Sequence, residues 1–323
     1  MDYRTRAVAA SAGALCLFAL VQLGAIALVT PFKEAGFQAV ENPQDPTNSA
    51  VYLAFILVAT GAMLLVIKYD VEWLLRGFLV ATSAMISWYV FSVPAGAIAP
   101  SLGVPSLALS GSAALIVGAA LYVHPEWYVI DAAGLIMGIG AAALFGISFG
   151  VLPALLFLSA LAIYDAIAVY RTKHMLTLAE GVMDLRVPVV LVFPLRLDYS
   201  FLDDDGPQAT EEGESEHEGE DDGRRDAFFI GLGDAVMPSI MVTSSAFFIE
   251  APALVAGTAL TLPSLGAMVG TLLGLTALLR MVFRGEAHAG LPLLNGGAIG
   301  GYLLGALAAG VPIVDALGLT PYV

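Results

Sequence analysis

Charged residues are scarce in this chain: Asp, Glu, Lys and Arg make up only 13% of its 323 residues, whereas 59% are hydrophobic. A soluble domain of this size needs far more charged surface, so the composition excludes one. Runs of about 20 apolar residues recur along the sequence, and each is long enough for a helix to cross the hydrocarbon core. The sequence therefore predicts an all-α polytopic membrane protein.

Cysteine and histidine are also rare. The single cysteine, Cys16, excludes a disulfide framework and a cysteine metal site. None of the four histidines lies inside an apolar run, so the Gly-x-Ser-x-Gly match at 146–150 has no base beside it. A zinc protease motif and a basic patch for nucleic acid are missing as well. We therefore predict no metal, no organic cofactor and no nucleic-acid partner.

Nine transmembrane spans are expected, at 7–31, 50–67, 73–93, 105–123, 127–147, 149–170, 227–248, 260–283 and 289–310. Pro94, Pro100 and Pro105 are expected to break the apolar run between the third and fourth spans. With a cytoplasmic N-terminus, 12 of the 13 Lys and Arg residues fall on the cytoplasmic side, and only Lys33 falls outside. This bias follows the positive-inside rule, supports the span count and predicts an extracellular C-terminus.

A long connection divides the chain into a six-helix part at 1–170, a cytoplasmic loop at 171–226 and a three-helix part at 227–323. Within the loop, 175–185 suits a short helix, and 187–197 suits an edge strand that packs on the membrane face or pairs with an unfolded substrate. The stretch 203–226 holds 12 acidic and two basic residues. It is expected to be disordered, either as a halophile's solvated loop or as a segment that binds a cation or a partner.

Two aspartates interrupt apolar runs. Asp165 follows Tyr164 in LSALAIYDAIAVY, and Asp234 follows Gly231-Leu232-Gly233 in FFIGLGDAVMPSIM. A carboxylate at membrane depth costs several kcal/mol and usually has a function. Asp165 is expected about two-thirds along the sixth span and Asp234 about a third into the seventh, and these antiparallel spans place both at a similar depth. Asp131, at the start of the fifth span, is interpreted as an interfacial or helix N-terminal carboxylate.

Two carboxyl groups in contact share one proton, because both cannot ionise together. One group then acts as a base on water, while the other donates a proton to a scissile carbonyl. Glycine costs about 1 kcal/mol against alanine in a helix, so Gly231 and Gly233 indicate close backbone approach or room for an extended substrate.

Small residues also recur at every fourth position of the last two spans. Such stripes let two helix backbones approach closely in lipid, so we interpret them as a packing surface. The glycines concerned are Gly266, Gly270 and Gly274 in the eighth span and Gly297, Gly301 and Gly305 in the ninth.

The ninth span opens with Ala289-Gly290-Leu291-Pro292, whose irregular backbone is stable in a membrane only inside protein or beside a cavity. With Tyr164-Asp165, Gly231-Leu232-Gly233-Asp234 and the division into six and three spans, the chain resembles the presenilin and signal peptide peptidase family of intramembrane aspartyl proteases. It looks most like the archaeal members. One departure stands out: Ala-Gly-Leu replaces the family's Pro-Ala-Leu.

The resemblance implies that Asp165 and Asp234 are the catalytic dyad of a Gly-x-Gly-Asp protease in the cell membrane. It also implies that Tyr164, Gly231, Leu232, Gly233, Ala289, Gly290, Leu291 and Pro292 shape the site. The expected partners are transmembrane helices of membrane-protein substrates within the lipid bilayer, and self-association stays open. The cytoplasmic N-terminus matches presenilins, which predicts substrates whose N-terminus lies outside.

Two alternatives remain. Paired intramembrane aspartates also serve as relays in proton- or cation-coupled transporters. However, no inverted repeat is apparent between the halves of this sequence. A prepilin-peptidase-like enzyme also uses Gly-x-Gly-Asp, but its second aspartate would normally be cytoplasmic, unlike Asp165.

Overall fold

Most of the residues that the structure describes are helical. The computed structural model describes residues 3–69, 72–169, 190–195, 200, 227–283 and 289–322. The helix expected at 175–185 and the acidic stretch at 203–226 lie outside these residues.

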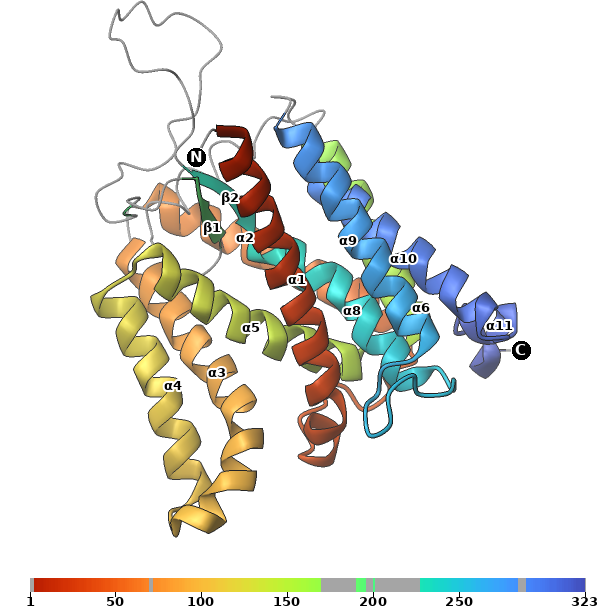
Figure 1. Cartoon of the computed structure of the whole chain (residues 1–323), viewed down its shortest axis with the longest axis horizontal. Helices are drawn as coiled ribbons and strands as arrows, with labels where there is room; N and C mark the ends of the chain where they lie inside the picture. The colour runs from red at the N-terminus through yellow and green to blue at the C-terminus, as the bar shows by residue number, and fades with distance from the viewer. Residues whose placement is uncertain are drawn as a thin grey trace, which may run out of the picture.

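The described residues of the N-terminal part form six helices, whose arrangement Figure 1 shows. They are α1 (Tyr3–Glu34), α2 (Thr47–Lys68), α3 (Glu72–Leu102), α4 (Ser106–Val123), α5 (Trp127–Ser148) and α6 (Val151–Ile167). The expectation that α3 ends near 93 was wrong, because Pro94 and Pro100 lie inside it. Prolines are tolerated in membrane helices where neighbours compensate, and α3 packs along α4. The chain turns instead at Gly103, whose φ of +65° suits a glycine after a helix.

Strand β1 (Val190–Pro194) lies in the long connection, and the C-terminal part contains strand β2 (Ala227–Gly231), followed by α8 (Leu232–Phe248), α9 (Leu262–Val282), α10 (Gly290–Ala308) and the short α11 (Ile313–Ala316). Among the described residues, six helices are long and apolar enough to cross a membrane: α1, α3, α4, α5, α9 and α10. Shorter apolar helices lie at Thr47–Met63, Val151–Ile167 and Leu232–Phe248. The six long helices overlap six of the expected spans, and the three shorter helices overlap the expected second, sixth and seventh spans.

The seventh span begins later than expected. Residues 227–231 form β2, which pairs antiparallel with β1 in the register Val190 with Gly231 and Pro194 with Ala227. The edge strand expected within 187–197 is confirmed at β1. The predicted helix at 227–231 was wrong because hydropathy does not distinguish a short apolar strand from a helix, and Phe228, Phe229 and Ile230 favour a strand.

Glycine stripes join α9 to α10, as the sequence predicted. A Cβ atom added at Gly270 would overlap the carbonyl oxygen of Gly297, and one at Gly266 would overlap that of Gly301. The two helices therefore touch backbone to backbone along several turns.

The main core lies where α5, α6, α8 and α10 meet, around Phe149, Leu158, Ile240 and Tyr302. Hydroxyl groups fasten these elements together: Thr243 Oγ1 of α8 donates to the Ala142 carbonyl of α5 at 2.9 Å. Large apolar side chains such as Phe55, Leu115 and Leu304 are exposed. Exposed apolar surface on this scale suits a protein surrounded by lipid.

Candidate active site

Asp165 lies in the last turn of α6 and is only 7% exposed. Its Oδ2 accepts a 3.0 Å hydrogen bond from the backbone N–H of Leu291, and the N–H of Gly290 also interacts with this carboxylate. Both amides belong to the first turn of α10, where backbone N–H groups have no partner within the helix. The start of the ninth span therefore faces Asp165, as its sequence suggested.

Asp234 lies in the first turn of α8, with Gly231 as the N-terminal cap. It was expected a third of the way into its span, and the pairing of β2 with β1 explains the difference. A Cβ atom at Gly290 would lie 3.4 Å from Asp234 Oδ1, and one at Gly231 would lie 3.5 Å from Oδ2. The Asp234 carboxylate therefore reaches the same backbone segment that binds Asp165.

The two carboxylates interact electrostatically with each other. Each carboxylate also meets the N-terminus of a helix: Asp234 belongs to the first turn of α8, and Asp165, from the last turn of α6, contacts the first turn of α10. Helix N-termini favour negative charge and so ease the cost of placing two carboxyl groups together. The described part of the chain contains no group of three or more His, Cys, Asp or Glu side chains placed to hold a metal ion.

The other residues expected to shape the site differ in their exposure and in their neighbours. Tyr164 is 49% exposed, whereas Leu232 is buried and packs toward Gly138 of α5. An added Cβ atom at Gly233 would meet nothing within 4 Å, so this glycine leaves open space beside Asp234. Ala289 is buried as the N-terminal cap of α10, and Pro292 follows in the first turn, where a missing N–H costs least.

Two further polar side chains have partners that sequence reasoning did not predict. Asn295, fully buried one turn beyond Leu291, donates from Nδ2 to the carbonyl of Leu158 in α6 at 3.0 Å. Asp131 of α5 accepts a 2.7 Å hydrogen bond on Oδ1 from the backbone N–H of Val192 in β1. A polar residue inside an apolar run was the available signal for both, but their partners are 137 and 61 residues away.

The Gly-x-Ser-x-Gly match serves a structural purpose. Ser148 is buried, and its Oγ accepts a hydrogen bond from the N–H of Ala39 at 3.0 Å. His124, the one histidine among the described residues, bonds to Tyr128 at 2.9 Å instead. The structure therefore supports setting aside a serine nucleophile.

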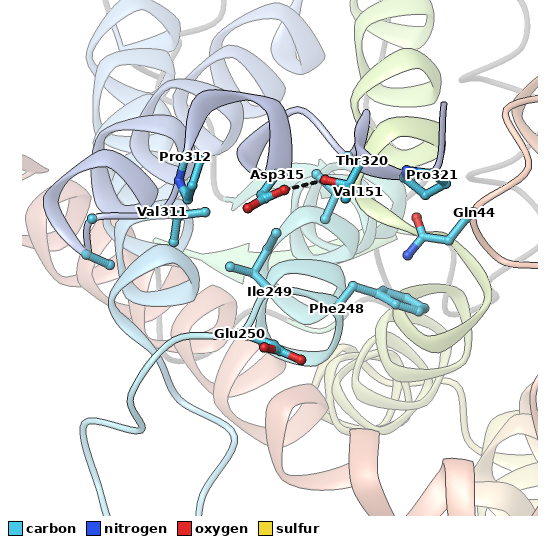
Figure 2. Close-up of a pocket in the computed structure, with 13 residues that line it drawn as sticks. Gln44, Val151, Phe248, Ile249, Glu250, Val311, Pro312, Asp315, Thr320 and Pro321 are labelled. Carbon is cyan, nitrogen blue, oxygen red and sulfur yellow. Dashed lines mark hydrogen bonds between the residues drawn. The ribbon is translucent and has the colours of Figure 1, made fainter. Parts of the chain in front are cut away.

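A pocket of about 490 Å³ lies at the opposite ends of α6, α8 and α10 from the aspartates (Figure 2). Val151, Phe248 and Val311 line it together with the acidic side chains Glu250 and Asp315. Asp315 is engaged by a hydrogen bond from Thr320. This pocket is separate from the aspartate pair, and the pair is the candidate active site.

Comparisons with known proteins identify the family to which the chain is similar. The sequence profile described as signal-peptide peptidase, presenilin aspartyl protease matches residues 15–311. A solved presenilin family intramembrane aspartate protease is 34% identical, with a TM-score of 0.66, and the match covers 93% of this chain and 99% of that chain. A second crystal form of such a protein is 35% identical, with a TM-score of 0.64, and covers 92% and 97%. No curated protein sequence matches.

The match spans nearly the whole chain, and the solved relatives share its fold at more than 30% identity. These findings favour proteolysis over transport. The chain belongs to the signal-peptide peptidase and presenilin family of aspartyl proteases, and it is an intramembrane aspartic protease.

Proposed function

We propose that Asp165 and Asp234 are the catalytic dyad of this protease. The observation that carries the proposal is their convergence on one backbone segment: Leu291 donates to Asp165, and Gly290 lies against Asp234. Two carboxylates from helices far apart in sequence meet beside backbone amides and the open face of Gly233. Such a pair needs no metal to hydrolyse a peptide bond.

In the proposed reaction, the ionised carboxylate removes a proton from water as the water oxygen adds to the scissile carbonyl carbon. The other carboxyl group donates its proton to the carbonyl oxygen, which gives a tetrahedral diol. Collapse of the diol breaks the C–N bond, and a proton passes to the leaving nitrogen. The substrate bond must be extended for water to reach it, so a transmembrane helix has to unwind locally.

The β1–β2 hairpin supports a proposal about how the unwound substrate is held. β2 continues without an intervening residue into α8, so the strand leads directly to Asp234. An extended substrate segment aligned with this hairpin would pass close to the dyad, and sheet pairing would offset the hydrogen bonds lost on unwinding.

We also propose nine spans with a cytoplasmic N-terminus and an extracellular C-terminus, in the parts 1–170, 171–226 and 227–323. The distribution of basic residues supports this topology in the cell membrane, and the acidic stretch suits a halophilic archaeal cell. Substrates with an outside N-terminus are then preferred, and cleavage of only the reverse orientation would contradict this. Both aspartates come from one chain, so one copy suffices for chemistry.

The test is cleavage of a labelled single-span reporter in liposomes by wild type, Asp165→Ala and Asp234→Ala. We expect cleavage by wild type alone, blocked by a transition-state isostere. Cleavage that persists in either folded variant would remove that aspartate from the mechanism. Ion-dependent uptake into the same liposomes, unaffected by the isostere, would favour the transporter alternative.

A further inference from the structure

The start of α5 carries two carboxylates that bind the segment around β1. Asp131 Oδ1 accepts the N–H of Val192 at 2.7 Å, and Glu126 Oε1 accepts the hydroxyl of Ser200 at 2.7 Å. Asp131 was expected to be an interfacial or helix N-terminal carboxylate. Its position near the start of α5 agrees with that expectation, but it binds a strand far away in the chain.

The direction of the Val192 N–H shows which edge of β1 faces α5. In an antiparallel pair, successive N–H groups point alternately toward and away from the partner strand. Val192 lies opposite Phe229 of β2, and its N–H is directed to Asp131. At this position the edge of β1 that faces away from β2 is therefore bound to α5.

Apolar contacts also join strand β1 to α5. Val192 is buried with Ile130 and Ala133 of α5, and a Cβ atom added at Gly134 would lie 2.8 Å from Leu191. The strand thus packs closely on α5, with a glycine leaving room for it. Apolar packing alone tolerates sliding, whereas a hydrogen bond to one particular N–H specifies one register.

The hairpin register affects the dyad through the chain itself. Gly231 ends β2 and caps α8, and Asp234 follows three residues later. A strand rises about 3.3 Å per residue, so a one-residue slip would displace the start of α8 by a distance comparable to a catalytic hydrogen bond.

We propose that Asp131 is a positioning residue: its hydrogen bond to Val192 fixes the β1–β2 hairpin on α5, and thereby aligns the extended substrate with Asp234. The alignment rests on the proposed function, in which the hairpin holds the substrate beside the dyad. In this proposal Asp131 acts through Val192 and takes no part in the chemistry itself.

The test uses the full-length protein with two nearly isosteric replacements. Asp131→Asn keeps an acceptor for the Val192 N–H, and Asp131→Leu removes it. Thr243→Val is the matched control, because it deletes a different hydrogen bond between α5 and α8 far from the hairpin. Hydrogen–deuterium exchange of the 190–193 backbone, the positions of the cleaved bonds, KM and kcat are measured for each variant.

We expect Asp131→Leu to speed exchange in β1 about tenfold, to spread cleavage over neighbouring bonds and to raise KM more than it lowers kcat. Asp131→Asn should restore the wild-type pattern. The inference is overturned if β1 exchange in Asp131→Leu matches wild type, or if its cleavage pattern and KM match those of Thr243→Val. If the wild type cleaves no reporter, the proposed function is contradicted instead. The exchange measurement still tests whether the Asp131 hydrogen bond holds β1 on α5.

Discussion

The backbone N–H of Leu291 donates a 3.0 Å hydrogen bond to Oδ2 of Asp165, joining two helices across 126 residues of sequence. The donor is a main-chain group. A side-chain substitution at position 291 would therefore leave this hydrogen bond in place. The identity of Asp165 matters in two ways, as an acceptor for this bond and as a proton carrier. Asparagine separates the two roles, because it accepts a hydrogen bond but does not exchange a proton at neutral pH.

Asp165→Asn and Asp234→Asn are each expected to lower reporter cleavage by at least about 10²-fold, the loss typical of removing general acid–base catalysis. The Leu291 bond should survive in Asp165→Asn, so the thermal unfolding temperature should stay near that of wild type. Cleavage rates and unfolding curves are measured on the same preparations. Near-wild-type cleavage by either variant would contradict the dyad.

Gly290→Ala is expected to keep most of the activity, whereas Gly290→Val should lose it. An alanine Cβ would lie 3.4 Å from Asp234 Oδ1 and 3.4 Å from Leu278, which are ordinary contacts. The branches of valine would enter the space of the Asp234 carboxylate. The measurement is kcat and KM for both variants, and an inactive but folded Gly290→Ala would show that the site needs a bare backbone here.

Gly270→Ala is expected to destabilise the protein by about 1–3 kcal/mol, as overpacking does. The added methyl group would overlap the backbone of Gly297, and backbone cannot move aside as a flexible side chain can. Gly300→Ala is the matched control, because an added Cβ atom there meets nothing within 4 Å. Thermal or denaturant unfolding in detergent compares the two, and equal stability would contradict the close contact of α9 with α10.

Asn295→Leu is expected to cost about 0.5–2 kcal/mol of stability, the usual range for a hydrogen bond between membrane helices. The lost bond joins α10 to Leu158 of α6, so the two helices that bring Leu291 to Asp165 become less firmly connected. We expect kcat to fall more than KM rises, because the dyad is disturbed rather than the substrate contacts. Unchanged kcat in a measurably destabilised variant would limit Asn295 to a structural role.

Local patterns in the sequence predicted the apolar helices, the glycine contact between α9 and α10, and strand β1. The meeting of Asp165 with Asp234 was also predicted, because adjacent antiparallel helices bring equal depths together. The residue at which α8 starts was not predicted, because an apolar run of five residues fits a strand as well as a helix. The partners of Asp131 and Asn295 depend on contacts between distant segments, which no local pattern encodes.

The glycine contact between α9 and α10 has a consequence for catalysis. A contact made of backbone atoms has no side-chain rotamers to order. The two helices therefore lose little conformational entropy when a substrate binds. The first turn of α10, with the amides that face Asp165, extends from this stiff pair of helices. Those donors are consequently pre-organised before binding, the condition under which fixed dipoles stabilise developing charge most effectively.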